Sequence, residues 1–192
     1  MSEPRPQVWL IRHGETEWSR SHKHTGLTDV PLTEAGEAAA ALLRPALADV
    51  AFDLVLTSPL GRARETARLA GFPDAVPESD AHEVDYGAYE GVTTVTIRES
   101  DPGWTVWSHP SPGGETLSAV AERADRVIGR LGAVPERSLL VAHGHFLRIL
   151  IARWLHLPPT AGAHFQFETA TLAVLSFERE TRTLSQLGVT PT

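Results

Sequence analysis

The sequence contains no cysteine. Disulfide bonds, thiolate metal sites and thiol nucleophiles are therefore excluded, and the lack of disulfides fits a reducing compartment. No apolar run is long enough to span a bilayer, and the first six residues lack the apolar core of a signal peptide. We therefore expect a cytoplasmic protein that makes no contact with a membrane.

Basic residues are in the minority. The 192 residues include 17 Lys and Arg against 24 Asp and Glu, which gives a formal net charge of −7. This argues against a nucleic-acid-binding protein, because such proteins need a basic surface. A small phosphorylated ligand is still compatible, since a few clustered Arg and His residues make a local positive pocket in an acidic protein.

The chain has the length of one domain, and we expect residues 1–192 to form it. No internal repeat, low-complexity tract or linker divides the sequence. The sequence does not decide between a monomer and a homodimer.

Strands that alternate with helices predict the fold class. We expect strands at 7–11, 53–57, 137–142, 165–167, 172–177 and 183–187. We expect helices at 34–44, 60–70, 93–100, 114–131 and 146–156, and a long loop at 17–28. Pro45 should end or kink the first of these helices. The pattern predicts an α/β domain with a mainly parallel central sheet flanked by helices on both faces.

Three of the predicted strands end in residues suited to phosphate chemistry. The first ends at Arg12 and His13. The second leads through Ser58 to Arg62, and the third ends at His143. Carboxyl ends of neighbouring parallel strands meet at one edge of a sheet, where ligands bind. Since an imidazole is a nucleophile and a guanidinium matches phosphate oxygens, this edge predicts a phosphate cage around a nucleophile. The alternative for the first pair is a turn whose side chains only meet solvent.

Ordered motifs over nearly the whole chain resemble the histidine phosphatase superfamily, which includes the cofactor-dependent phosphoglycerate mutases. They are RHGET at 12–16, TGLTDVPLT at 25–33, SPLGRARETA at 58–67, EVDYG at 83–87, GET at 114–116 and HGH at 143–145. Residues 85–97, with Thr25 and Gly26, are most similar to bacterial acid phosphatases and to the sedoheptulose-bisphosphatase branch. The resemblance implies a phosphoglycerate mutase-like fold.

The resemblance also implies an activity, which is hydrolysis of a small phosphorylated metabolite such as a sugar phosphate, without metal or cofactor. It implies that His13 becomes phosphorylated, while the phosphoryl oxygens are held by Arg12, Arg62 and His143. Glu83 would first protonate the leaving alkoxide and then activate water.

Further substrate contacts are implied by the resemblance at Ser19, Thr25, Gly26, Tyr86 and Gly144. Relatives often carry Asn at the position of Ser19, so its hydrogen bond to phosphate would be shorter, water-mediated or absent.

Several alternatives stay open. A phosphoglycerate-type mutase would return the phosphoryl group to its substrate, although residues 87–114 offer little chain for a lid that keeps water out. A non-catalytic relative would bind a phosphorylated ligand, but it would not need both a nucleophile and an acid. Asp85 is the alternative acid to Glu83. His143 and His145 would need a third ligand to hold a metal, so none is expected.

Other residues are expected to have structural roles or to lie in solvent. His22 and His24 should titrate on an exposed loop, and His145 should make a structural hydrogen bond. Arg148 should be an ion-pair partner. The tryptophans Trp104, Trp107 and Trp154 should pack in the core or under a lid.

Overall fold

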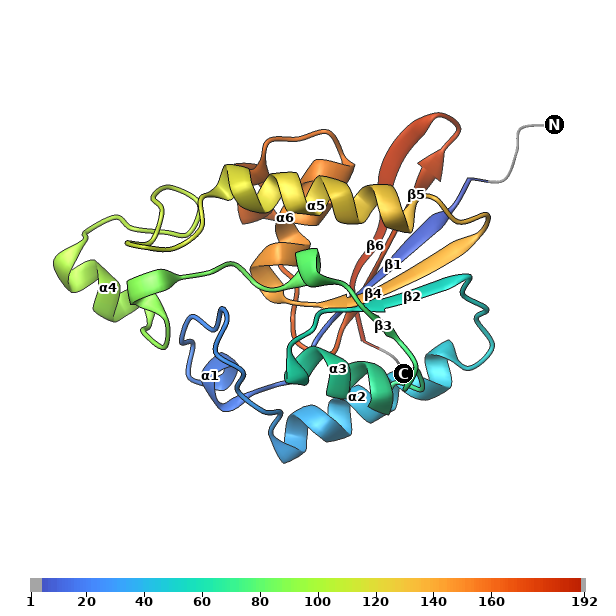
Figure 1. Cartoon of the computed structure of the whole chain (residues 1–192), viewed down its shortest axis with the longest axis horizontal. Helices are drawn as coiled ribbons and strands as arrows, with labels where there is room; N and C mark the ends of the chain where they lie inside the picture. The colour runs from blue at the N-terminus through green and yellow to red at the C-terminus, as the bar shows by residue number, and fades with distance from the viewer. Residues whose placement is uncertain (1–4, 191–192) are drawn as a thin grey trace.

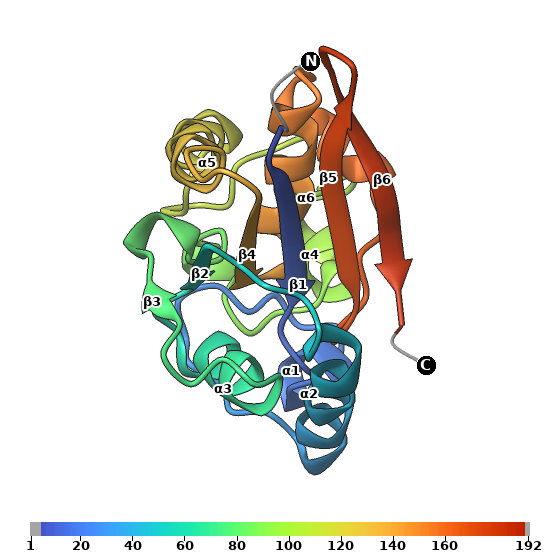
Figure 2. The ribbon, with the colours of Figure 1, turned by 90° about the vertical axis from the view of Figure 1, so that its right-hand side faces the viewer.

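The computed structural model of the protein describes residues 5–190. A six-stranded sheet, in the order β3-β2-β4-β1-β5-β6, lies between two layers of helices (Figures 1 and 2). The strands are β1 Gln7–Arg12, β2 Leu54–Thr57, β3 Val76–Pro77, β4 Arg137–Ala142, β5 Leu172–Glu178 and β6 Thr181–Val189. The first four are parallel to one another, whereas β5 and β6 each run antiparallel to the preceding neighbour in the sheet.

The helices divide between the two faces of this sheet, with α2 and α3 on one face and α5 and α6 on the other (Figure 1). Their bounds are α1 Glu17–Arg20, α2 Glu34–Leu47, α3 Gly61–Leu69, α4 Thr94–Ser100, α5 Leu117–Leu131 and α6 Gly144–Trp154. Three short 3-10 helices complete the elements: η1 Ser79–Ala81, η2 Gly87–Tyr89 and η3 Pro159–His164.

Each face of the sheet has its own apolar core. Leu10 and Leu140 pack toward α5 and α6, whereas the next residues along, Ile11 and Val141, pack toward α2 and α3. Successive side chains of a strand point to opposite faces, so a strand covered on both faces needs a continuous apolar run. This explains why β1 and β4 contain no alternation of apolar and polar residues.

The predicted α/β class with a mainly parallel sheet is confirmed: four strands are parallel, and only β5 and β6 at one edge run antiparallel to their preceding neighbours. Some details of the expected elements are wrong. The expected loop at 17–28 contains α1, since Thr16 and Ser19 form a capping box. Helix α2 continues past Pro45 to Leu47, because only the last turn is affected and Leu47 is buried. Residues 165–167 form no strand; the Phe167 carbonyl accepts a hydrogen bond from Arg12 instead.

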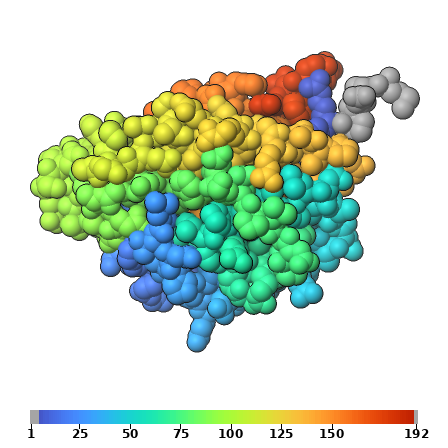
Figure 3. Space-filling model, viewed as in Figure 1, coloured from blue at the N-terminus to red at the C-terminus, as the bar shows by residue number. Residues whose placement is uncertain are grey.

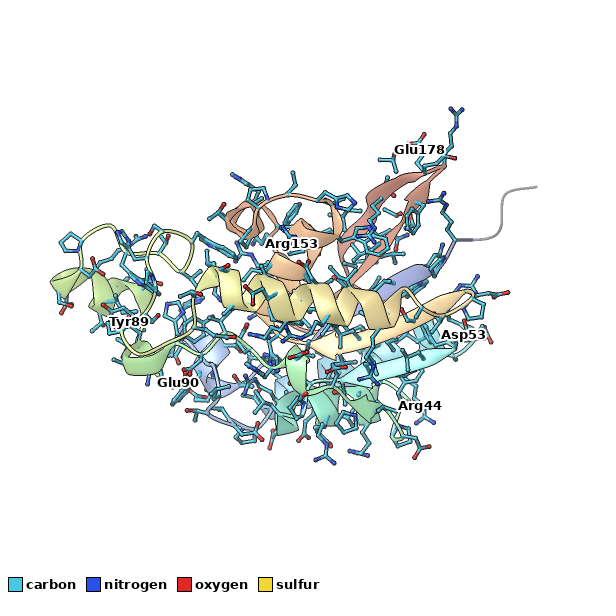
Figure 4. All side chains as sticks on the ribbon, turned by 45° about the horizontal axis from the view of Figure 1, so that its top comes forward. Arg44, Asp53, Tyr89, Glu90, Arg153 and Glu178 are labelled. Carbon is cyan, nitrogen blue, oxygen red and sulfur yellow. The ribbon has the colours of Figure 1, made fainter. Side chains whose placement is uncertain are left out.

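Strand register determines where the site lies. Arg12 pairs with Ala142, and Thr57 pairs with Val141, so β1, β4 and β2 end side by side. The residues that follow these strands therefore emerge at one edge of the sheet. Asp53, before β2, lies at the other end of the molecule from Tyr89 and Glu90 (Figure 4).

Among residues 5–190, no helix combines the length and apolar character needed to cross a bilayer.

Candidate active site

A pocket of about 210 Å³ lies at the carboxyl edge of the parallel strands. Most of the predicted site residues line it: Arg12, His13, Ser19, Thr25, Glu83, Tyr86 and Gly144. The predicted residues Arg62 and His143 lie behind His13, and Gly26 lies in the loop whose carbonyls bind Arg62. The segment that carries α4 forms the end of the molecule on this side (Figure 3). The structure thus brings together residues that are up to 132 positions apart in the sequence.

His13 is buried directly after β1, and its surroundings define its protonation. Nδ1 lies 2.7 Å from the carbonyl oxygen of Gly14. Because a carbonyl oxygen only accepts, Nδ1 carries the proton and Nε2 carries the lone pair. Burial, together with the positive charges of Arg62 and Arg12, holds the pKa of His13 well below its usual range. Near neutral pH this side chain is therefore the neutral imidazole, which is its nucleophilic form.

Arg12 presents a donor that the protein does not use. Its Nη1 donates to the Phe167 carbonyl at 2.6 Å, whereas its buried Nε has no hydrogen-bond partner among the described residues. Gly144 allows this placement, since a Cβ there would approach Arg12 Cζ and Nε to 3.2 Å. An unpaired buried donor is costly, and a phosphate oxygen is the acceptor that a guanidinium suits best. Arg12 can therefore bind an anion in the pocket.

Arg62 and His143 stand behind His13 and bind each other. The His13 and His143 ring centroids are 5.1 Å apart. Arg62 Nε donates to His143 Nδ1 at 3.2 Å, so the His143 proton is on Nε2, 2.7 Å from Ser58 Oγ. Burial and the charge of Arg62 hold the pKa of His143 well below its usual range. His143 is thus a neutral donor at the back of the site.

The remaining donors of Arg62 hold the loop in front of it. Its Nη1 donates to the carbonyl of Thr28 at 2.9 Å, and its Nη2 donates to those of Thr25 and Gly26 at 3.3 and 2.8 Å. Gly26 itself donates its N–H to Glu90, which is labelled in Figure 4. The loop predicted to contact substrate is therefore anchored to the same cation that adjoins the two histidines.

Glu83 lies at the N-terminus of α6. Its Oε1 accepts the N–H groups of Val84 and Phe146 at 2.9 and 2.8 Å, and Oε2 accepts that of His145 at 3.0 Å. A helix N-terminus offers unpaired N–H groups, and the Glu83 side chain accepts two of them from α6. Asp85, the alternative acid, does not line the pocket; its Oδ1 accepts the N–H of Gly87. The geometry therefore favours Glu83.

The hydroxyl groups of three predicted substrate contacts are hydrogen-bonded within the protein. Ser19 Oγ accepts the N–H of Thr16 and donates to its carbonyl, so this hydroxyl caps α1 at the pocket wall. Thr25 Oγ1 donates to the carbonyl of Lys23 at 3.2 Å. The buried Tyr86 hydroxyl is hydrogen-bonded to Nδ1 of His145, as expected for a structural role of that histidine.

Five further residues line the pocket that sequence reasoning did not assign to it: His22, Lys23, His24, His145 and Arg148. The expectation that His24 is solvated is wrong. Its ring lies 4.8 Å from Tyr86 and 5.0 Å from Trp104, because an isolated bridge between Lys23 and Thr93 folds the loop inward. Nothing local in the sequence signals that contact.

Arg148 was expected to form an ion pair, and this is wrong as well. It donates to the carbonyls of Gly162 and Ala163 and covers the ring of Trp107, 4.6 Å from its centroid. The sequence alone could have placed Arg148 at the pocket. Gly144, a predicted site residue, begins the same helix, and residues four positions apart share a helix face. Trp104 and Trp154 are buried in the core, as expected.

Acid should destabilise the fold through the half-buried His24. Burial lowers the pKa of His24 to about 4, while an unfolded histidine titrates near 6.5. Between these values the unfolded chain binds more protons, so the free energy of unfolding falls as the pH falls, by up to about 1.4 kcal/mol per pH unit for each such histidine. The free energy of unfolding, measured by denaturant titration at several pH values between 6.5 and 4, should fall less steeply with falling pH in His24→Gln than in the wild type. Identical slopes would contradict this prediction.

The two histidines of the HGH motif do not share a ligand. His143 binds Arg62 and Ser58, whereas His145 binds Tyr86. Within the described part of the chain, no three His, Asp or Glu side chains gather in a way that could hold a metal ion.

Comparison with known proteins identifies the family of the chain. The profile of the histidine phosphatase superfamily (branch 1) matches residues 8–190. The chain is 43% identical to an acid phosphatase of Mycobacterium tuberculosis over 188 residues, which cover 96% of this chain and 93% of that one. It is 32% identical to a sedoheptulose 1,7-bisphosphatase of Saccharomyces cerevisiae, covering 79% and 68% of the two chains.

A solved structure from Mycobacterium tuberculosis superposes with a TM-score of 0.93 at 40% identity, covering 97% of this chain and 99% of the other. The fold is therefore phosphoglycerate mutase-like, as the motifs implied. The family match over nearly the whole chain, together with the His13 and Arg12 geometry, leads to one conclusion: the chain belongs to branch 1 of the histidine phosphatase superfamily and is a phosphatase.

Proposed function

We propose that the protein hydrolyses a small phosphorylated metabolite, a sugar phosphate, through a phosphohistidine intermediate on His13. The observation that carries this proposal is the 2.7 Å contact between His13 Nδ1 and the Gly14 carbonyl. This contact leaves the lone pair on Nε2, at the pocket, beside an arginine with an unused donor. A nucleophile and an anion-binding group thus face the same small space.

In the first step, the Nε2 lone pair of His13 attacks phosphorus and the bond to the leaving oxygen breaks. Arg12 binds the phosphoryl oxygens, and Arg62 adds positive charge from behind. His143 completes the cage when its Nε2–H breaks its hydrogen bond to Ser58 Oγ and donates to a phosphoryl oxygen instead. Glu83 donates a proton to the leaving alkoxide, which is a poor leaving group without one. We assign this proton to Oε2, because Oε2 accepts one backbone N–H and Oε1 accepts two.

In the second step, Glu83 is ionised and takes a proton from water. The resulting hydroxide attacks phosphorus, the N–P bond breaks, and the electron pair returns to His13 Nε2. Phosphate leaves, and the starting protonation of both residues is restored. Positioning and charge supply the catalysis, so the proposed cycle needs no metal ion or cofactor.

The substrate class follows from the pocket and from the relatives. A space of about 210 Å³ suits a small molecule. Polar groups of Thr25, His24 and Tyr86 surround it, as a polyhydroxylated leaving group requires. Lys23 and Arg148 add positive charge at the wall. A relative whose name specifies a sugar bisphosphate is 32% identical to this chain over 187 residues.

Turnover of a panel of sugar phosphates and 3-phosphoglycerate, with a chelator present, tests the proposal. Both free phosphate and isomerised product are followed. We expect phosphate release from at least one sugar phosphate and no isomerisation. Isomerisation that depends on a bisphosphate primer would establish a mutase instead. Tight binding of these compounds without turnover would indicate a non-catalytic phospholigand-binding protein, and either result contradicts the proposal.

A further inference from the structure

Arg123 lies on α5, outside the pocket lining, and is 3% exposed. A guanidinium has five N–H donors, and Arg123 uses all of them within the protein. Nη1 donates to the backbone carbonyls of Asp80 and His82 at 2.8 and 2.6 Å, and Nη2 donates to that of Glu83 at 3.1 Å. Residues 82–86 form neither helix nor strand. One side chain therefore binds the Asp80 carbonyl of η1 and two carbonyls of this irregular segment.

Glu115 completes the arrangement just before α5. Its carboxylate accepts from Arg123 Nε and Nη2 at 2.8 and 2.9 Å, a bidentate ion pair. The same carboxylate accepts the N–H of Asp85, and the Glu115 N–H donates to the Asp85 carbonyl at 2.9 Å. Arg123 thus binds the carbonyls of residues 80, 82 and 83, and Glu115 binds the backbone of residue 85. We call Arg123 and Glu115 with these hydrogen bonds the clamp, and Glu83 lies between its outermost contacts.

The clamp also reaches the helix that holds the Glu83 side chain. Arg123 Cζ lies 4.6 Å from the centroid of the Phe146 ring. The backbone N–H of Phe146 is one of the donors to Glu83 Oε1. Arg123 therefore contacts Glu83 through its carbonyl and packs on the residue that binds its carboxylate.

We propose that Arg123 and Glu115 are positioning residues for proton transfer by Glu83. This rests on the proposed role of Glu83. An error of about 1 Å in the placement of a catalytic group costs about 10²-fold in rate. Glu83 lies on an irregular segment, so its carboxylate is no better placed than the backbone that carries it. The Arg123–Glu115 pair fixes that backbone on both sides of the acid.

Arg123→Lys tests the proposal, because lysine keeps the charge but cannot make the five-donor contact. The readout is kcat/KM, which covers the steps up to phosphohistidine formation, for a sugar phosphate and for p-nitrophenyl phosphate. Nitrophenolate leaves without a proton. We therefore expect a loss of about 10²-fold on the sugar phosphate and less than about tenfold on the aryl ester. Equal losses on both substrates would show a purely structural role and overturn the proposal.

The matched control is Arg126→Lys, one turn further along α5. Arg126 binds the same segment through the side chain of Asp80, at 2.8 Å from both carboxylate oxygens, and is exposed. We expect wild-type kcat/KM on both substrates. The same substrate dependence in Arg126→Lys would overturn the specific role of Arg123. If Arg123→Lys does not fold, Glu115→Gln replaces it; this variant keeps an acceptor and should show the same substrate dependence, and its absence would overturn the proposal.

Glu83→Gln separates this inference from the proposed function. If Glu83→Gln shows no leaving-group dependence, the acid assignment itself fails. If Glu83→Gln loses more kcat/KM on the sugar phosphate than on the aryl ester and Arg123→Lys does not, only the positioning role fails. If both show it, the double variant should lose no more on the sugar phosphate than Glu83→Gln alone, because both changes act on one proton transfer. Fully additive losses in the double variant would overturn the proposal.

Discussion

Replacement of His13 by alanine should lower kcat by about 10⁶-fold, the scale seen when an enzyme loses its nucleophile. Arg12, Arg62 and Glu83 remain in this variant, but the proposed mechanism gives none of them a lone pair that attacks phosphorus. The His13 side chain makes one hydrogen bond within the described structure, to Gly14, so the fold should survive its removal. Steady-state hydrolysis of p-nitrophenyl phosphate and a thermal unfolding scan measure the two effects.

The control for this variant is His109→Ala, which removes an exposed histidine on the α4 side of the molecule. Its kcat should equal that of the wild type. Turnover by His13→Ala within tenfold of the wild type would exclude His13 as nucleophile. Loss of activity together with loss of cooperative unfolding would point to a structural role instead.

Glu83→Gln should slow sugar phosphates by about 10²- to 10⁴-fold, the usual contribution of a general acid. The same variant should lose far less kcat/KM on p-nitrophenyl phosphate, whose leaving group is already a weak base. Glutamine also brings an NH₂ group toward the N-terminus of α6, where Glu83 accepts the N–H groups of His145 and Phe146. Comparison of kcat/KM for the two substrates isolates the missing proton from this general disturbance.

Asp85→Asn is the matched control, because Asp85 is the nearby carboxylate outside the pocket and asparagine keeps an acceptor for the Gly87 N–H. It should retain the wild-type ratio of kcat/KM for the two substrates. A ratio that changes in Asp85→Asn and not in Glu83→Gln would move the acid role to Asp85.

Local signals were sufficient to predict the back of the site. Arg12, His13 and His143 directly follow or end apolar strands, and Arg62 opens the helix after another. Parallel pairing alone then places their backbones at one edge, and this is what the register of β1, β2 and β4 shows. The fold class was predictable for the same reason, since alternating strands and helices leave few architectures.

The rest of the pocket depends on contacts between distant, irregular segments. His24 and Glu83 lie on stretches without periodicity, and both bind distant residues: His24 binds Thr94, 70 positions away, and Glu83 binds Phe146, 63 positions away. Arg123 is a charged residue on an amphipathic helix, yet it is buried because carbonyls of residues 80–83 surround it. No pattern within a short window encodes such partners.

The central claim is that the phosphoryl group passes through His13 Nε2. Rapid mixing of Glu83→Gln with p-nitrophenyl phosphate tests it most directly, because the second step lacks its base and the intermediate should accumulate. An alkaline quench preserves phosphohistidine, and mass spectrometry of the peptide locates it. We predict a burst of nitrophenolate of one equivalent per active site and a phosphoryl group on His13. Steady release of nitrophenolate without a burst, from an enzyme whose His13 peptide stays unmodified, would contradict the account.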